Sequence, residues 1–590
     1  MIRLLAGMPV SSTCVEAKQR AASERPPALD NPDGAAQCGA RSRRRRSRTR
    51  AVEGSLRVDD IVIRGGQVVD GSGAPGRVAD VVIRDGRVAA IEPGHVGPAR
   101  RVFDARGRVV SPGFVDVKTH SDWTLPLNPR AESKVRQGVT TEVIGHCGFS
   151  VAPVLPGRVE LLRDYLAPSA PWLPFRETTF AEYMDAFPAT SVNTVMLVGH
   201  NTLRLMAMGM ANRPPTADEM TLMRRMLEEA LAAGALGLSS GLFTAPGCFA
   251  GAEEMVSLAH VLRRYGASYA THVRDEARRV FEAVREAIAI AETCGVHVEI
   301  VHLKLSGTDG WGGAARLLAE IEAARQRGVP VDCDQYPYTT ASNPLRNLLP
   351  TWVQEGGVDA MLARLGRPDV RDRAREDIAA DGLGSWGRIP SWDAVRVAVS
   401  PHRPECEGRT LGDIARSRSF DGVDAVCDFL IADRGATRVL IASMAEEDVR
   451  ELLRSPMVLV GSDGYAVAPY GVTGQGKPHP RCYGTFPRVL GQYVRELRLL
   501  TLPQAIHKMT GGPAAAIGLV ARGLLRAGYR ADVTVFDPET VAERATFDEP
   551  HQYPVGIVTV IVNGVPVVDG GEHTGALPGQ VLRRRSGGVG

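Results

Sequence analysis

The sequence predicts an α/β protein whose main domain is a TIM-like (β/α)8 barrel. Three observations support this fold. Eight apolar runs of strand length alternate with segments of helical periodicity along the middle of the chain. These runs are apolar at successive positions, as expected for parallel strands that are buried on both faces. Short strands with glycine-containing turns occur near both chain ends and predict a small β-sandwich beside the barrel.

The barrel elements follow one another in a regular order. The predicted strands occupy residues 114–120, 141–147, 193–200, 235–240, 267–272, 297–303, 330–336 and 457–463. Helical periodicity between them is clearest from Asp218 to Ala233 and from Ala277 to Thr293, just before Gly295. The gap between the last two strands is too long for one helix. We therefore expect a mainly helical insertion at residues 345–450 that covers the barrel mouth as a lid.

Both chain ends contribute to the predicted β-sandwich, which takes residues 57–110 and 510–583. Residues 61–70 and 80–91 each contain a hairpin turn, Gly65-Gly66 in the first and Asp85-Gly86 in the second. Matching apolar strands occur near the other end, in residues 531–536 and 558–568. The barrel domain then spans residues 111–509 and includes the insertion.

The composition excludes several classes of protein. The chain has 590 residues, 44% of them apolar and 23% charged, which suits a barrel with an additional folded domain. Its nine cysteines are odd in number and show no disulfide framework, so we expect a reducing compartment. No apolar run approaches the roughly 20 residues of a membrane span, and no clear signal peptide is present. These features predict a cytoplasmic protein without a membrane partner.

Residues 1–56 are predicted to be a disordered, arginine-rich extension. Residues 41–50 carry seven arginines, a pattern that can bind nucleic-acid or membrane phosphates. We favour a solvated tail, or a start codon assigned too far upstream. No aromatic residues are interleaved with the arginines, and no nucleic-acid-binding motif follows, so a nucleic-acid partner is not expected. The oligomeric state stays open.

Functional groups occur where the barrel strands end, which is where a (β/α)8 barrel places its active site. The groups at these ends are Lys118, His120, Cys147, His200, Ser239, Ser240, His272, His302, Lys304, Tyr336 and Asp463. Zinc prefers cysteine sulfur and histidine nitrogen, and catalytic sites leave one position for water. A single buried cysteine or histidine would indicate packing alone. Because three such residues stand at strand ends, we predict that Cys147, His272 and His302 bind zinc.

A carboxylate at the end of the last strand completes the predicted site. Asp463 can take a proton from a water molecule and pass it to a leaving group. Its alternative role is to cap the following helix. His146 is expected to point away from the neighbouring Cys147 and to be structural. For His200 two roles stay open, donation to a substrate carbonyl or a structural hydrogen bond.

Several ordered motifs resemble the amidohydrolase superfamily. They are Pro112-Gly113-Phe114-Val115-Asp116, Thr119-His120-Ser121-Asp122, Gln137-Gly138-Val139-Thr140-Thr141 and Gly461-Ser462-Asp463-Gly464. Cys147 at the second strand narrows the resemblance to the D-aminoacylases, or N-acyl-D-amino-acid deacylases. Further similar segments are Gly237-Leu238-Ser239-Ser240-Gly241-Leu242, His272-Val273-Arg274-Asp275-Glu276, Tyr336-Pro337-Tyr338 and Pro478-His479-Pro480-Arg481. The resemblance covers roughly residues 58–583.

The resemblance implies a zinc-dependent hydrolase. Zinc would be held by Cys147, His272 and His302, and Asp463 would act first as general base and then as general acid. The substrate would be an N-acyl-D-amino acid, cleaved at its amide bond to a carboxylate and a free D-amino acid. The groups that the resemblance places around the substrate α-carboxylate are Lys304, Tyr336 or Tyr338, and Arg481.

The chain departs from the superfamily pattern at its first strand, which usually ends in His-x-His. Here it ends in Lys118-Thr119-His120. A protonated lysine cannot bind a cation, and the fourth strand, residues 235–240, carries no lysine for a carboxylated metal bridge. We therefore expect one tightly bound zinc ion, with Lys118 paired to Asp463 and His120 as a further candidate ligand. The alternatives are a cyclic-amide hydrolase of the hydantoinase or dihydroorotase type, or a non-catalytic scaffold with the same fold.

Overall fold

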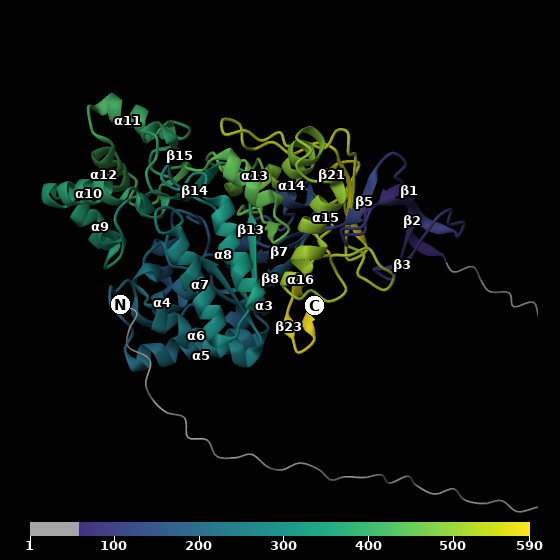
Figure 1. The fold of residues 1–590 in the computed structure, drawn as a ribbon, viewed down its shortest axis with the longest axis horizontal. Coiled ribbons are helices and arrows are strands. Elements are labelled where there is room, and N and C mark those ends of the chain that lie inside the picture. Colours follow the sequence, from purple (N-terminus) through teal and green to yellow (C-terminus); the bar gives the residue numbers. More distant parts are fainter. Residues whose placement is uncertain (1–57) are drawn as a thin grey trace, which may run out of the picture. The chain divides into compact units, whose positions relative to one another are not determined.

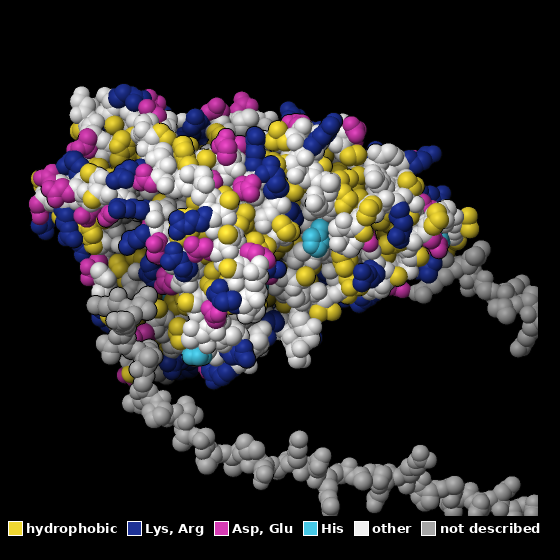
Figure 2. Space-filling view, in the orientation of Figure 1, with side chains coloured by type: hydrophobic (Ala, Val, Ile, Leu, Met, Phe, Trp, Pro, Cys, Tyr) yellow, Lys and Arg dark blue, Asp and Glu magenta, His cyan; other side chains and the backbone are white. Residues whose placement is uncertain are grey.

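The computed structural model describes residues 58–590, and Figure 1 shows how their helices and strands are arranged. The extension predicted for residues 1–56 lies outside the described residues. Within residues 58–590, no helix is long and apolar enough to cross a membrane. Basic and acidic side chains are interspersed on the face seen in Figure 2, which agrees with the net charge of only +3.

Parallel strands form the centre of the described chain. Six pair in the order β17-β13-β12-β11-β10-β9, and three more in the order β8-β7-β6. Their bounds are β6 (Phe114–Asp116), β7 (Val139–Ile144), β8 (Asn193–Met196), β9 (Val198–Gly199), β10 (Gly237–Gly241), β11 (Ser268–His272), β12 (Val298–Ile300), β13 (Val331–Gln335) and β17 (Val458–Val460). Each of the eight predicted strands is present, although most are shorter than predicted.

The first and last of these parallel strands are also joined. The backbone N–H of His120 donates to the Gly464 carbonyl at 2.8 Å, and the N–H of Asp463 donates to the Lys118 carbonyl at 2.8 Å. These bonds lie just beyond the ends of β6 and β17. They bring together two segments that are more than 300 residues apart in sequence.

Helices alternate with the parallel strands and pack against them. The main ones are α4 (His200–Met208), α5 (Ala217–Ala233), α6 (Ala252–Tyr265), α7 (Val280–Cys294), α8 (Ala314–Gln326), α13 (Glu446–Arg454) and α15 (Leu502–Met509). Shorter ones are α1 (Glu132–Val135), α2 (Val159–Leu166), α3 (Phe180–Asp185), α14 (Arg481–Arg488) and α16 (Gly511–Ala516). Helix α5 begins with a capping box between Thr216 and Glu219, and α7 ends at Gly295 in the left-handed conformation. Both boundaries lie within three residues of the predicted ones.

Strands from the two chain ends share one nine-stranded sheet. Its order is β21-β20-β19-β18-β5-β1-β2-β3, and β4 pairs with β1. The bounds are β1 (Asp59–Val68), β2 (Arg77–Arg84), β3 (Arg87–Glu92), β4 (Ala99–Asp104), β5 (Val109–Pro112), β18 (Val533–Phe536), β19 (Ile557–Val562), β20 (Val565–Asp569) and β21 (Glu572–His573). The antiparallel pair of β5 and β18 joins the early and late segments. Ile63, Val81 and Val533 belong to the apolar cluster of this sheet.

The segment between β13 and β17 combines helices with a small antiparallel sheet. Its sheet has the order β14-β16-β15, with β14 (Thr340–Pro344), β15 (Val395–Val399) and β16 (Arg438–Ala442). Its helices are α9 (Val358–Leu365), α10 (Pro368–Asp381), α11 (Leu411–Arg418) and α12 (Gly422–Ala432); Figure 1 shows them in green beside β14 and β15. The predicted insertion at 345–450 thus contains β15 and β16 but leaves out β14, which begins at Thr340. Its end is also too late, because α13 packs against α8 and β17.

Short strands complete the described chain near its C-terminal end. They are β22 (Val581–Leu582), β23 (Arg584–Arg585) and β24 (Gly588–Val589). Strand β22 pairs in parallel with β8. The last residues are therefore anchored to one of the parallel strands.

Candidate active site

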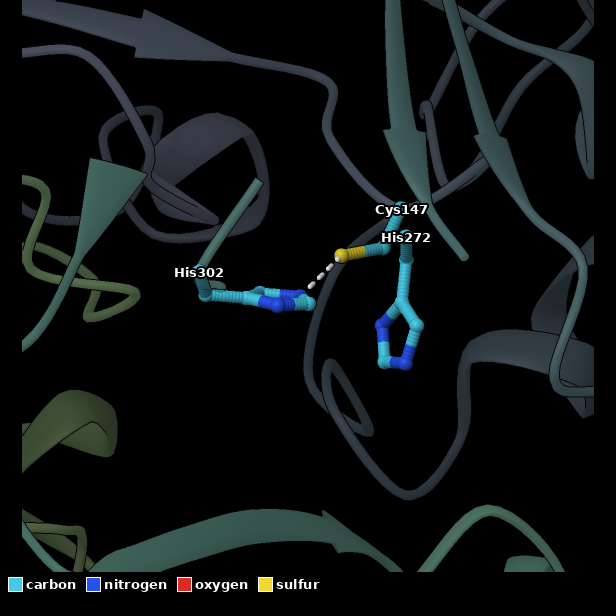
Figure 3. Close-up of side chains that lie close together, drawn as sticks. All are labelled: Cys147, His272 and His302. Atoms are coloured by element: carbon cyan, nitrogen blue, oxygen red, sulfur yellow. Dashed lines mark hydrogen bonds between the residues drawn. The ribbon is translucent and has the colours of Figure 1, made fainter. Parts of the chain in front are cut away.

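Three predicted ligands meet at the ends of three parallel strands, of which β11 and β12 are neighbours. Cys147 follows β7, His272 is the last residue of β11, and His302 follows β12. The Cys147 Sγ lies 3.3 Å from the His302 Nε2, and one candidate ligand atom from each residue lies within 4.8 Å of the others. Figure 3 shows the sulfur directed at the His302 ring, with the His272 ring beside them. Tetrahedral ligands at roughly 2.0–2.3 Å from a metal lie about 3–4 Å apart.

The surroundings of this group suit a metal ion. All three residues are buried, and neither ring nitrogen of His272 has a hydrogen-bond partner within residues 58–590. A buried polar atom without a partner is costly unless something else satisfies it. The donor set of one sulfur and two imidazoles is the kind that zinc prefers. The residues present therefore fit a bound zinc ion.

Left-handed backbone conformations orient the site residues. The φ angles are +56° at Cys147, +39° at His302 and +51° at Asp463. Non-glycine residues seldom adopt such angles. The predicted strands ran through these positions, but the strands end earlier because the chain turns there. Each functional side chain consequently projects from a turn beyond a strand.

The turn around Cys147 is fixed by close packing and by one serine. A Cβ added to Gly148 would lie 2.2 Å from the Asn201 Oδ1, so only glycine fits this position. The Ser239 hydroxyl accepts from the Gly148 N–H at 3.0 Å and donates to the Gly145 carbonyl at 2.5 Å. Ser239 thus closes the loop that presents the Cys147 sulfur.

Glu276 lies between the two histidines, a position that the sequence analysis did not identify. Its Oε1 lies 3.1 Å from the His302 Nδ1 and 2.5 Å from the Lys304 Nζ, while its Oε2 lies 3.3 Å from the His272 Nε2. Burial opposes ionisation, but the charges of His272, Lys304 and His302 hold the pKa of Glu276 well below its usual value. The sequence could have indicated this residue, because Glu276 follows His272 by four positions within one of the segments that resemble the family.

Asp463 lies between two cations. It forms an ion pair with Lys118, and its Oδ2 lies 2.8 Å from an Nη2 of Arg481. The Lys118 Nζ also lies 2.8 Å from the His120 Nε2, and burial lowers the pKa of Lys118 to about 8. The His120 ring stacks on Trp123 with centroids 4.9 Å apart. His120 thus lies with Lys118 and Asp463, outside the cysteine–histidine group.

The predicted carboxylate-binding residues have different surroundings. Arg481 is buried, its guanidinium carbon lies 4.6 Å from the Tyr336 ring centroid, and its Nε and Nη1 lack partners within residues 58–590. The Tyr336 hydroxyl also has no partner there. Lys304 pairs with Glu276. Tyr338 instead donates from its hydroxyl to Glu543 at 2.7 Å, so Tyr336 is the tyrosine of this turn that lines the site.

Three further candidates lie outside the cavity lining. His200 begins α4, and its Nε2 lies 2.8 Å from the Oε1 of buried Glu254. Ser240 exchanges hydrogen bonds with Tyr269 at 2.8 Å and Thr271 at 2.9 Å. His146 is fully buried, which lowers its pKa well below the usual value. These contacts favour the structural role for His200 among the two that the sequence left open.

The site residues line a common cavity that is partly open to solvent. Its walls include Cys147, His272, His302, Lys304, Tyr336 and Asp463. The segment between β13 and β17 adds Ser342, Trp386 and Arg438. None of these last three was predicted. Ser342 and Arg438 belong to the antiparallel sheet that the sequence pattern did not reveal, and Trp386 ends a short 3-10 turn.

Comparisons with known proteins place the chain in a family. The model of the amidohydrolase family matches residues 101–568. An N-acyl-D-aspartate deacylase of Alcaligenes xylosoxydans xylosoxydans is 39% identical over 528 residues, which cover 89% of this chain and 95% of the relative. The crystal structure of an N-acyl-D-glutamate deacylase from Bordetella bronchiseptica, complexed with zinc and a phosphonate mimic of the tetrahedral intermediate, is 38% identical with a TM-score of 0.74.

A D-aminoacylase structure is similar to the same extent. It is 36% identical with a TM-score of 0.75, and the work on it describes one-metal activation and second-metal attenuation of a binuclear centre. Each of the two structural matches covers 89% of this chain and 100% of the solved chain. The chain therefore belongs to the amidohydrolase family, and within it to the group formed by the D-aminoacylases and N-acyl-D-amino-acid deacylases.

Proposed function

We propose that this enzyme is a zinc-dependent N-acyl-D-amino-acid deacylase, which cleaves its substrate to a carboxylate and a free D-amino acid. The observation that carries the proposal is the convergence of Cys147, His272 and His302 on one buried point, in one cavity with Asp463. A sulfur, two imidazoles and a nearby carboxylate are the parts that metal-assisted amide hydrolysis needs. The similarity to deacylases over most of the chain agrees with this assignment.

We propose that the parallel strands form a closed (β/α)8 barrel within residues 111–509. The backbone bonds between Lys118–His120 and Asp463–Gly464 support closure, because they join the first strand to the last. Residues 57–110 and 510–583 would then form the separate β-sandwich domain. The segment that carries β14 to β16 and α9 to α12 would act as a lid, which the contributions of Trp386 and Arg438 to the cavity wall support.

One zinc ion, held by Cys147, His272 and His302, would supply a Lewis acid that acidifies the attacking water and polarises the amide carbonyl. The Lys118 ammonium argues against a second ion beside it. It lies between His120 and Asp463, and it offers no lone pair to a cation. Glu276 would orient the His302 ring through its Nδ1 and leave the Nε2 free to bind.

Asp463 would transfer the proton. Its carboxylate accepts a proton from the attacking water and later gives it to the nitrogen of the departing amine. Lys118 and Arg481 keep the carboxylate in place from two sides. The unpartnered donors of Arg481 and the Tyr336 hydroxyl, together with Lys304, would hold the substrate α-carboxylate.

The cyclic-amide alternative lacks a required group. A carboxylated lysine would have to come from the fourth parallel strand, and β10 reads Gly-Leu-Ser-Ser-Gly. We therefore keep the linear amide as the proposed substrate bond.

Amine release from N-acetyl-D-methionine and N-acetyl-L-methionine tests the proposal. We expect release from the D-form alone, its loss with a chelator, and its return when zinc is added. Release from both forms, or D-selective release that a chelator leaves unchanged, would contradict the assignment. The Asp463→Asn variant controls for a contaminating hydrolase.

A further inference from the structure

A second cavity, partly open to solvent, lies between α2 and the segment that joins β13 to β17. Leu161, Asp164 and Tyr165 of α2 form one wall, while Arg346 and residues of α9 form the other. The cavity has a volume of about 190 Å³, far more than the roughly 10–15 Å³ that one water molecule needs. It shares no lining residue with the active-site cavity. We call it the Arg346 cavity.

Arg346 places a positive charge at the buried end of this cavity. The residue is 4% exposed, and within residues 58–590 no carboxylate forms an ion pair with it. Its Nη2 donates to the Tyr165 carbonyl at 2.6 Å, whereas its Nε and Nη1 have no hydrogen-bond partner in that range and are not sealed from solvent. Burial lowers the pKa of Arg346, so keeping this guanidinium charged has a cost. An anion in the cavity would offset this cost.

Gln354 adds an acceptor to the same cavity. It is 3% exposed, and its Nε2 donates to the Arg346 carbonyl at 3.4 Å. Its Oε1 has no hydrogen-bond partner among the described residues. A buried amide oxygen without a donor is unfavourable. A donor bound in the cavity would satisfy it.

Two carboxylates stand at the exposed end of the cavity. Asp164 belongs to α2 and Asp359 to α9, and both residues are exposed. No lysine or arginine of the described chain forms an ion pair with either. Partial burial and the nearby charge of Asp359 raise the pKa of Asp164. Two like charges that face the same space favour a cation between them.

The cavity therefore has an end for an anion, an end for a cation and an apolar wall. The apolar wall is formed by Leu161, Met210, Val358 and Met361. A simple anion would leave the two carboxylates unmatched, and a simple cation would leave Arg346 unmatched. An α-amino acid carries both charges on one carbon atom. Its carboxylate can accept two parallel bonds from Arg346, and its ammonium can donate to Gln354 and the carboxylates.

We infer that the Arg346 cavity is a second binding site, which takes a free amino acid with an apolar side chain. The D-amino acid that the proposed deacylase releases belongs to this class, and this identification of the ligand as the product rests on the proposed function. The ring of Tyr165 lies 5.5 Å from that of Phe149, which lines the active-site cavity. A bound product would thus lie behind the wall of the site that released it. It would contact both α2 and α9 and thereby join the inserted segment to its neighbour.

Equilibrium dialysis of the zinc-loaded enzyme with radiolabelled D-methionine tests the inference. The active site would hold the same carboxylate through Arg481, so the measurement uses Arg481→Met, which leaves the Arg346 cavity unchanged. We expect this variant to bind one D-methionine per chain with a Kd below about 1 mM. Adding Arg346→Met should weaken the binding at least about 30-fold, because it removes the buried partner of the carboxylate. Adding Arg367→Met, at an exposed arginine that pairs with Asp369, should leave it unchanged.

The ammonium end has its own test, which does not disturb the core. Because Asp164 and Asp359 are exposed, replacing both by asparagine should weaken D-methionine binding by only about threefold to fivefold. Methylthiobutanoate, which is methionine without its amino group, should bind at least about tenfold more weakly than D-methionine. If it binds equally well and the asparagine variant has no effect, the cavity is a plain anion site and the inference is overturned.

The remaining outcomes also decide. Absence of D-methionine binding in Arg481→Met, or binding that Arg346→Met leaves unchanged, overturns the inference while the deacylase function stands on amine release. If Arg481→Met does not retain zinc, the comparison is made in the native background, where Arg346→Met should remove one bound D-methionine. If Arg346→Met does not fold, unchanged binding in the asparagine variant overturns the inference. Binding without any amine release from N-acetyl-D-methionine supports the site and overturns the proposed function.

Discussion

Lys118 and Asp463 form a buried ion pair at the junction between the first and last parallel strands. The pair combines a structural contact with the proposed chemistry, because it links two distant segments and also positions the carboxylate that would move the proton. Arg481 supports the same carboxylate from another direction. The site is therefore complete only when the segments that follow β6 and β17 have come together.

Replacing Asp463 by asparagine tests its role in proton transfer. The amide keeps the size of the side chain but accepts no proton, so kcat should fall by roughly 10²–10⁴-fold. Bound zinc should stay unchanged, because Asp463 lies outside the group formed by Cys147, His272 and His302. Steady-state kinetics and elemental analysis check the two expectations. A variant with more than a tenth of the native kcat would remove Asp463 from the mechanism.

Metal content tests the three proposed ligands. The purified enzyme should hold one tightly bound zinc ion per chain, and Cys147→Ala should lose most of it. Cys333→Ala is the matched control, since Cys333 is equally buried within β13 and lies outside the ligand group. Two tightly held ions per chain would reject the single-zinc proposal. Full zinc retention by Cys147→Ala would reject the sulfur ligand.

Glu276→Gln tests the carboxylate that lies between the two histidines. Glutamine keeps the shape and removes the charge, so zinc affinity should fall by about 10–100-fold, as for other residues that orient metal ligands. Competition with a chromophoric chelator measures this affinity. Glu320→Gln serves as the control, because Glu320 on α8 pairs with Arg285 on α7 at 2.9 Å and lies outside the ligand group. Equal zinc affinity in the two variants would rule out an orienting role.

Lys508 should make stability depend on pH in the alkaline range. Its Nζ donates to the Val458 carbonyl at 2.7 Å, and burial lowers the pKa of Lys508 to about 8. In the unfolded chain the pKa is about 10.4. Between these values the unfolded state binds more protons, so the contribution of Lys508 to the free energy of unfolding rises with pH.

Denaturant unfolding of native enzyme and Lys508→Met should reveal this dependence. Their difference in unfolding free energy should shift by about 2–3 kcal/mol in favour of the native enzyme between pH 8 and 10.4. Lys477→Met, at a more exposed lysine, should show no such shift. A constant difference for Lys508→Met across this range would mean that Lys508 keeps its ordinary pKa when folded.

The sequence predicted the order of strands and helices because burial imposes a simple pattern on them. Strand β17 is apolar at every one of its buried positions, and α5 carries its own capping signals at Thr216 and Glu219. Strand β16 of the insertion was harder to predict, because so short an apolar segment can equally be a buried turn of helix. Its pairing with β14 depends on contacts about 100 residues away in sequence.

The site was predictable where one residue type at a strand end has a specific chemistry. Cys147, His272 and His302 come together as this reasoning expects. Partners inside loops gave no such signal. Tyr336 and Tyr338 would share a face in an extended strand, but the Tyr338 N–H bonds to the Tyr336 carbonyl, and this tight turn separates the two side chains. Glu276 likewise meets the histidines through a loop that has no repeating pattern.

The left-handed backbone at Cys147, His302 and Asp463 has a consequence for directed evolution. Each of these conformations costs an L-residue about 1–2 kcal/mol, whereas glycine adopts it freely. Glycine at Asp463 would relieve this strain but leave the buried cations Lys118 and Arg481 without their carboxylate, a larger cost, and glycine at any of the three positions removes a functional side chain. Libraries meant to raise heat resistance should hold these codons constant and seek their gains elsewhere in the chain.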